Sequence, residues 1–187
     1  LLAQAADLVG RRGAYLGTLG FGRPGALKGA GLTTPDCVSV HRRLAEARDA
    51  GAKTLGLEAS SHALDQGRVA GVRFDTAVFT NLTRDHLDYH GTLEAYGEAK
   101  ARLFRAPGLR RCVINVRDDF GRALAERVDP SLERVLFSTS NEIWAEAGTV
   151  AMASGLLFLL TTTVTFYFRE LYESRLALGL FLLLNAL

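Results

Sequence analysis

Short β-type runs alternate with amphipathic helical patterns along most of this chain. An apolar helical pattern opens the sequence, and Gly10 follows it as the expected helix end. Further strands are expected at 15–19, 54–58, 76–81, 112–116 and 135–138, and further helices at 35–50, near Ser61, at 93–105 and at 119–128. This alternation predicts an α/β fold with a mostly parallel, doubly wound sheet that is covered by helices.

The helix at 35–50 has the best-defined ends. Thr34 is the expected N-cap, Pro35 suits the first helical position, and Gly51 follows the last turn. We therefore expect the Thr34 hydroxyl to accept a backbone N–H at the start of this helix.

The last quarter of the chain differs from the rest in composition. Residues 147–168 include no charged residue, and these 22 positions would be long enough to cross a bilayer if they were helical. However, four of the five residues at 161–165 are threonine and the fifth is valine, and Gly148 and Gly155 are typical of turns, which favours two or three antiparallel strands over a membrane helix. We expect residues 1–140 to form the α/β part, and residues 141–187 to form a small antiparallel subsheet and an unusually apolar end of the same domain.

Composition and charge exclude several classes of protein. The chain has 187 residues, 48% of them hydrophobic, which is enough for one globular domain with its own core. Its 22 basic and 20 acidic residues leave a formal charge of +2, so we expect no nucleic-acid partner. Cys37 and Cys112 are expected to be reduced thiols in a cytoplasmic protein, because no secretory leader precedes them.

Polar residues follow two of the predicted strands. Glu58 ends the strand at 54–58, and His86 comes shortly after the strand at 76–81. If these strands are neighbours, both side chains meet beyond the carboxyl ends of the sheet, where ligands collect in open α/β folds. A carboxylate and an imidazole can ligate a divalent cation, and the hard oxygen favours Mg²⁺ or Mn²⁺. The spacing supports equally well a structural interpretation, in which Glu58 caps the next helix and Asp88 holds a surface His86.

Lys100 falls on the apolar face of the helix predicted at 93–105. That face also carries Leu93, Tyr96, Leu103 and Phe104. A lysine there must extend to solvent, pair, or change its chemistry, because burying a bare ammonium is costly. Extension to solvent is the common outcome. The alternative is that desolvation favours the neutral amine, which captures carbon dioxide and supplies a carbamate oxygen near a metal.

Three segments carry a family signature, at residues 32–36, 58–68 and 79–91. The first segment is Leu32-Thr33-Thr34-Pro35-Asp36. The second begins with Glu58-Ala59-Ser60-Ser61-His62, and the third ends with Thr83-Arg84-Asp85-His86-Leu87-Asp88-Tyr89-His90-Gly91. Together they resemble the central ATPase domain of the Mur ligases, and within that family the MurE ligases, which add the third amino acid of the peptidoglycan stem. The resemblance runs from about Tyr15 to Ser138 and implies a P-loop-NTPase-like domain.

The resemblance also implies roles for individual residues. The UDP-N-acetylmuramoyl dipeptide would be held by Thr33, Thr34, Ser60, Gln66 and Arg68, with the guanidinium pairing an anionic group. Lys100 resembles the family's carboxylated lysine, and Glu58 and His86 resemble its residues at a Mg²⁺ (or Mn²⁺) site. The implied reaction transfers a phosphoryl group from ATP to the glutamyl carboxylate of UDP-MurNAc-L-Ala-D-Glu, and the amine of diaminopimelate or lysine then attacks the acyl phosphate.

The sequence departs from the family in one important respect. It contains no glycine-lysine phosphate loop, which in the family precedes the helix that opens this chain. We expect an internal fragment that is inactive alone. Two other hypotheses stay open: a binding-only remnant that retains the sugar-nucleotide surface, and a metal-dependent hydrolase that uses Glu58, His86 and a water. A zinc protease is excluded, because Leu87 stands between His86 and His90 where that motif requires glutamate.

Overall fold

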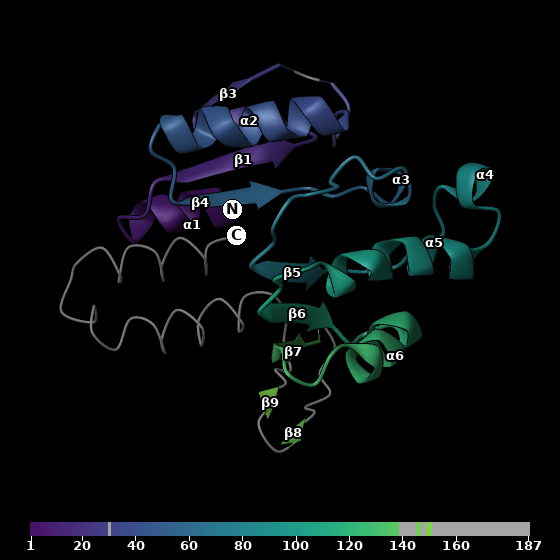
Figure 1. Ribbon diagram of the computed structural model, residues 1–187. Coiled ribbons are helices and arrows are strands. Elements are labelled where there is room, and N and C mark those ends of the chain that lie inside the picture. Colours follow the sequence, from purple (N-terminus) through teal and green to yellow (C-terminus); the bar gives the residue numbers. More distant parts are fainter. Residues whose placement is uncertain (30, 139–144, 147–148, 151–187) are drawn as a thin grey trace. The chain divides into compact units, whose positions relative to one another are not determined.

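The computed structural model describes residues 1–29, 31–138, 145–146 and 149–150 (Figure 1). The chain divides into two compact units. The first comprises Leu1–Arg73 and Asp85–Leu103, and the second comprises Phe74–Arg84 and Phe104–Leu187. All the site residues predicted from the sequence belong to the first unit.

The first unit is built on a mixed sheet with the strand order β3-β2-β1-β4. Its strands are β1 (Gly13–Gly17), β2 (Gly20–Arg23), β3 (Ala26–Lys28) and β4 (Thr54–Leu57). β1 and β4 are parallel, as the alternation of strands and helices predicts, whereas β2 pairs antiparallel with both β1 and β3. The sequence did not predict β2 and β3, because they are too short, and β2 too rich in glycine, to show an alternating pattern.

The helices of the first unit are short, and the longest has 13 residues. They are α1 (Leu2–Leu8), α2 (Cys37–Asp49), α3 (Ser61–Asp65), α4 (Leu87–His90) and α5 (Leu93–Ala101). α1 packs on β1 and β4. This packing is close: a Cβ at Gly13 would lie 2.0 Å from the backbone O of Ala3, so the strand requires glycine there.

The predicted N-cap of α2 is wrong. The Asp36 side chain, not that of Thr34, accepts the N–H of Ser39 at 2.9 Å. The Thr34 hydroxyl instead donates to the backbone O of Glu58 at 2.6 Å. A long-range partner therefore takes the hydroxyl that local sequence rules assign to the helix end.

The helix predicted at 93–105 is α5 followed by a 3₁₀ turn at Arg102–Arg105. The Thr92 hydroxyl caps α5 by accepting the N–H of Ala95 at 3.1 Å. Tyr96 is buried as predicted, but Leu93 is exposed and Lys100 is half-buried. The buried positions of α5 are otherwise small residues, so its inward face is narrower than the apolar pattern suggested.

The second unit contains a parallel sheet with the order β5-β6-β7. Its elements are β5 (Thr76–Phe79), β6 (Arg111–Asn115), α6 (Asp119–Arg127) and β7 (Glu133–Phe137). Ala77, Cys112 and Ile114 are fully buried in this sheet. These elements confirm the predicted alternation from 76 to 138, with shifts of one or two residues at their ends.

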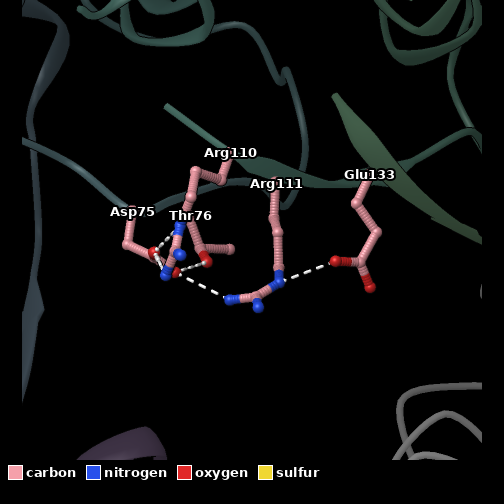
Figure 2. A network of polar contacts seen from close by, with 5 residues as sticks. All are labelled: Asp75, Thr76, Arg110, Arg111 and Glu133. Carbon is pink, nitrogen blue, oxygen red and sulfur yellow. Dashed lines mark hydrogen bonds and ion pairs between the residues drawn. The ribbon is translucent and has the colours of Figure 1, made fainter. Parts of the chain in front are cut away.

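Charged residues connect the first residues of all three strands in the second sheet (Figure 2). Asp75 lies just before β5, and its carboxylate accepts from Nε of Arg110 at 2.6 Å and from Nη1 of Arg111 at 2.9 Å. Arg111 also donates from Nε to Glu133 of β7 at 2.8 Å, and the Thr76 hydroxyl donates to Asp75 at 3.0 Å. Opposite charges thus hold the three strand starts in register.

Little of the predicted C-terminal subsheet can be compared with the structure. β8 (Ala145–Glu146) and β9 (Thr149–Val150) form an antiparallel pair. The rest of the segment that we expect to form antiparallel strands, at 151–168, lies outside the described residues. Within the described part of the chain, no helix has the length and apolar character needed to span a bilayer.

Candidate functional site

The carboxyl ends of β1 and β4 lie side by side in the first unit, because the two strands are parallel and directly paired. Glu58 follows β4, and its side chain contacts the end of β1. The hydroxyl of Tyr15 donates to Oε1 of Glu58 at 2.7 Å. The N–H and the hydroxyl of Thr18 both donate to Oε2, at 2.9 and 2.8 Å. The Thr33 hydroxyl lies 2.9 Å from that of Thr18, and it must be the donor, since Thr18 has one hydroxyl hydrogen and directs it to Glu58.

These hydrogen bonds determine the charge state of Glu58. Burial by itself raises the pKa of the carboxyl group, but the hydrogen bonds from Thr18 and Tyr15 outweigh this effect and hold the pKa below its usual value. The phenol responds in the opposite direction, because burial and the adjacent carboxylate raise the pKa of Tyr15. Gly17 leaves room for both groups: a Cβ there would lie 2.4 Å from Oη of Tyr15 and 2.6 Å from Cδ of Glu58. Glu58 is therefore an oriented carboxylate anion at neutral pH.

Thr34 connects the segment before α2 to the segment after β4. It is fully buried. Its hydroxyl donates to the backbone O of Glu58 and accepts the N–H of Ser60 at 3.0 Å. Ser60 is the N-cap of α3, where its hydroxyl accepts the N–H of Ala63 at 3.2 Å. The structural alternative in which Glu58 caps this helix is therefore wrong.

A chain of hydrogen bonds continues from Thr34 through the end of α3 to α4. Nη1 of Arg68 donates to the backbone O of Thr34 at 3.0 Å, and Nε of Arg68 donates to Oε1 of Gln66 at 2.9 Å. Nε2 of Gln66 donates to the hydroxyl of Tyr89 at 3.1 Å. Tyr89 donates in turn to Oδ2 of Asp65 at 2.8 Å, which lowers the pKa of Asp65.

Aromatic rings from α3, α4 and α5 form a cluster beside this chain, made of His62, His86, Tyr89, His90 and Tyr96. The ring of His62 lies 4.2 Å from Tyr89, 4.8 Å from His86 and 5.4 Å from His90, between centroids. Burial, with repulsion from His62, lowers the pKa of His90. The ring centroids of Tyr96 and His86 are 5.7 Å apart, and the Nζ of Lys100 lies over the Tyr96 ring, 4.7 Å from its centroid. Lys100 and His86 thus contact the same tyrosine.

The structure brings some of the predicted site residues together and leaves others with separate contacts. Thr34, Ser60, Gln66 and Arg68 form one hydrogen-bonded set, and Thr33 reaches Glu58 through Thr18. The strands that were expected to bring Glu58 and His86 together pair with different partners, β4 with β1 and β5 with β6. The carboxylate beside His86 is that of Asp85, at 3.6 Å, and not that of Asp88.

The metal site stays a prediction. Among the described residues, no group of three or more His, Cys, Asp and Glu side chains is placed to hold a metal ion. Glu58 contacts Tyr15 and Thr18, whereas His86 and Lys100 contact Tyr96. A shared cation would need a further donor, such as a carbamate on Lys100.

Sequence reasoning missed several residues that orient the site. Tyr15 and Thr18 hold Glu58. Thr18 directly follows the carboxyl end of β1, which is the same signal that pointed to Glu58, whereas Tyr15 lies in the middle of that strand. Asp65 and Tyr89 lie inside the segments that carry the family resemblance, but no pattern in the sequence indicates that they contact each other.

The comparisons with known proteins decide the family. The profile of the Mur ligase middle domain matches residues 1–187. The chain belongs to the Mur ligase family. The resemblance found in the sequence is thereby confirmed, and so is the α/β fold class.

Two similar proteins and one solved structure within the Mur ligase family carry the same name. A UDP-N-acetylmuramoyl-L-alanyl-D-glutamate--2,6-diaminopimelate ligase from Xanthomonas campestris pv. campestris (strain 8004) is 52% identical over 156 residues, which are 83% of this chain and 31% of that protein. A ligase of the same name from Pseudomonas aeruginosa is 60% identical over 125 residues, 67% of this chain and 26% of that protein. A solved structure with this name is 39% identical, with a TM-score of 0.66, and the match covers 73% of this chain and 28% of the solved chain. The chain thus spans at most about a third of the length of these relatives.

Proposed function

We propose that this chain is the central part of an ATP-dependent ligase that joins an amino acid to UDP-N-acetylmuramoyl-L-alanyl-D-glutamate in peptidoglycan synthesis. The relatives are named for 2,6-diaminopimelate, and we propose the same third amino acid here. One structural observation supports the proposal most directly. Four residues that the resemblance assigns to the dipeptide substrate, Thr34, Ser60, Gln66 and Arg68, form one connected hydrogen-bonded set.

In this proposal the substrate carboxylate attacks the γ-phosphorus of ATP, and the bond from that phosphorus to the bridging oxygen breaks to release ADP. The amine of the third amino acid then attacks the acyl phosphate, and inorganic phosphate leaves from the tetrahedral intermediate. Little covalent chemistry falls to the protein, so its residues act by binding and orienting. Arg68 would pair with an anionic group of the dipeptide, and Ser60 and Thr33 would supply hydroxyl groups. We assign this reaction to the cytoplasm.

A divalent cation, Mg²⁺ or Mn²⁺, is part of the proposal, and it would offset the charge on the transferred phosphoryl group. Glu58 has the hard oxygen ligands that such ions prefer, and its hydrogen bonds keep it anionic. His86 and a carbamate on Lys100 would be the other ligands. A carbamate on Lys100 would add an oxygen ligand to this set, since the described carboxylates and imidazoles form no group of three or more around one point.

The proposal is tested first on the protein expressed from its complete reading frame. Phosphate release should require ATP, the UDP-muramoyl dipeptide and the third amino acid together. Release that does not depend on all three would contradict the ligase and favour the hydrolase hypothesis. Binding of the dipeptide without any turnover would favour the binding-only hypothesis.

Lys100→Ala tests the carboxylated lysine in the same protein. We expect loss of ligation that added bicarbonate does not restore, because the variant has no amine to carboxylate. A short organic acid should restore part of it by supplying an oxygen ligand in the same space. Lys53→Ala is the matched control, since Lys53 is an exposed lysine between α2 and β4. Turnover of Lys100→Ala at the rate of the Lys53→Ala control would remove Lys100 from the mechanism.

A further inference from the structure

The hydrogen bonds between Arg68 and Asp65 have a defined direction at every step. A guanidinium can only donate, so Gln66 must turn its Oε1 toward Arg68. The amide nitrogen of Gln66 then faces Tyr89 and donates to it. Tyr89 has a single hydroxyl hydrogen, which it gives to Asp65. The orientation of the Gln66 amide is therefore determined from both sides.

Asp65 and Tyr89, at one end of this series of hydrogen bonds, are held by contacts that do not involve Arg68. Oδ1 of Asp65 pairs with Nη1 of Arg102 at 2.8 Å, which leaves Oδ2 for Tyr89. The Tyr89 ring packs on His62, with centroids 4.2 Å apart. Asp65 and Tyr89 come from α3 and α4, so these two contacts tie both helices to the residue that follows α5.

Arg68, at the other end of this series of hydrogen bonds, has N–H groups left to bind a ligand. Arg68 donates from Nε and from one N–H of Nη2 to Oε1 of Gln66, and from one N–H of Nη1 to the backbone O of Thr34. A guanidinium has five N–H groups. Among the described residues, the second N–H of each Nη has no acceptor, so two donors can meet an anionic ligand group. The direction in which they point is set by the contacts that hold the guanidinium, those with Gln66 and with the backbone O of Thr34.

We propose that Tyr89, anchored by Asp65, is a positioning residue for the UDP-muramoyl dipeptide: through the Gln66 amide it sets the orientation in which Arg68 meets the anionic group of that substrate. Gln66 then acts mainly through Arg68 and only secondarily by direct contact. This inference rests on the proposed function, because it takes Arg68 as a substrate-binding residue.

Tyr89→Phe removes the hydroxyl and keeps the ring on His62. The Gln66 amide then loses its acceptor and Asp65 loses a donor, so the amide can turn away from Arg68. In the protein expressed from its complete reading frame, we expect the Kd of UDP-N-acetylmuramoyl-L-alanyl-D-glutamate, measured by calorimetry without ATP, to rise about 3- to 10-fold. The Kd of ATP should stay within about twofold, and the thermal unfolding temperature should hardly change. Thr76→Val is the matched control, because it removes a hydroxyl that donates to a carboxylate in the second unit.

Making Tyr89→Phe also in the Arg68→Lys variant separates a positioning role of Tyr89 from a general structural role. A lysine ammonium lacks the planar, fixed donors of the Arg68 guanidinium, so in Arg68→Lys the affinity for the dipeptide should depend little on how Gln66 is oriented. In that background we expect Tyr89→Phe to change the dipeptide Kd by less than about twofold. An equal factor in both backgrounds, or normal binding by Tyr89→Phe alone, overturns the inference and leaves the proposed function standing. Failure of the unsubstituted protein to bind the dipeptide overturns both.

Discussion

Replacing Thr34 by valine tests the most deeply buried contact of the site. Valine has almost the same shape as threonine, so packing is kept and only the hydroxyl is lost. That hydroxyl serves two backbone groups at once, the O of Glu58 at 2.6 Å and the N–H of Ser60 at 3.0 Å. Thr34 is completely buried, so water cannot replace the hydroxyl without a rearrangement of the chain around it.

The expected loss follows from the cost of leaving those groups unpaired. An unpaired buried donor or acceptor costs about 1–3 kcal/mol. Both backbone groups are partly buried, so we use the lower part of this range and expect Thr34→Val to reduce the free energy of unfolding by about 2–4 kcal/mol. Thr34→Ser keeps the hydroxyl and removes one methyl group, which should cost about 1 kcal/mol.

Urea unfolding measures the free energy of unfolding of both variants, and hydrogen exchange of the Ser60 amide measures how well its hydrogen bond is kept. The Ser60 amide should exchange much faster in Thr34→Val than in Thr34→Ser. If Thr34→Val unfolds within about 0.5 kcal/mol of the unsubstituted protein, or if both variants lose the same stability, the hydroxyl does not carry the contact and the reasoning is refuted.

Two further substitutions examine charge in each unit. Gly17→Ala should push the Glu58 carboxylate off its donors and raise its pKa, as followed by NMR titration, whereas Gly56→Ala, with its nearest neighbour at 3.9 Å, should leave that pKa unchanged. Asp75→Asn tests stability in acid. The hydrogen bond from Arg110 contributes most to lowering the pKa of Asp75 in the folded protein. The Asp75 carboxylate therefore stabilises the fold above its unfolded pKa, and this stabilisation is lost as the pH falls through the lower folded pKa. The variant should therefore have a flatter acid limb in a plot of unfolding free energy against pH, and an unchanged limb would contradict this.

The sequence predicted the principal elements because their signals are local. Apolar periodicity and punctuating residues locate α2, α6, β5 and β6 within one or two residues. The β2–β3 hairpin and α4 were missed, since runs of three or four residues carry too little periodicity to be recognised.

The candidate site was predictable to a similar depth. Motif segments indicated Thr34, Ser60, Gln66 and Arg68, and the structure links these residues by hydrogen bonds. Their supporting residues could not be predicted in the same way. Tyr89 was quoted within a motif, but its contact with Asp65 spans 24 residues of sequence and depends on how α3 and α4 pack.

The sequence by itself determined the α/β class, the family and which residues are candidates for the chemistry. Tertiary structure decided which groups the candidates contact: Thr34 bonds to the backbone O of Glu58, just after β4, instead of capping α2, and Tyr15 reaches Glu58 across 43 residues. The reason is physical. Helix and strand signals depend on neighbours a few residues apart, whereas the partner of a polar side chain depends on which backbone groups the sheet register and helix packing bring within about 3 Å.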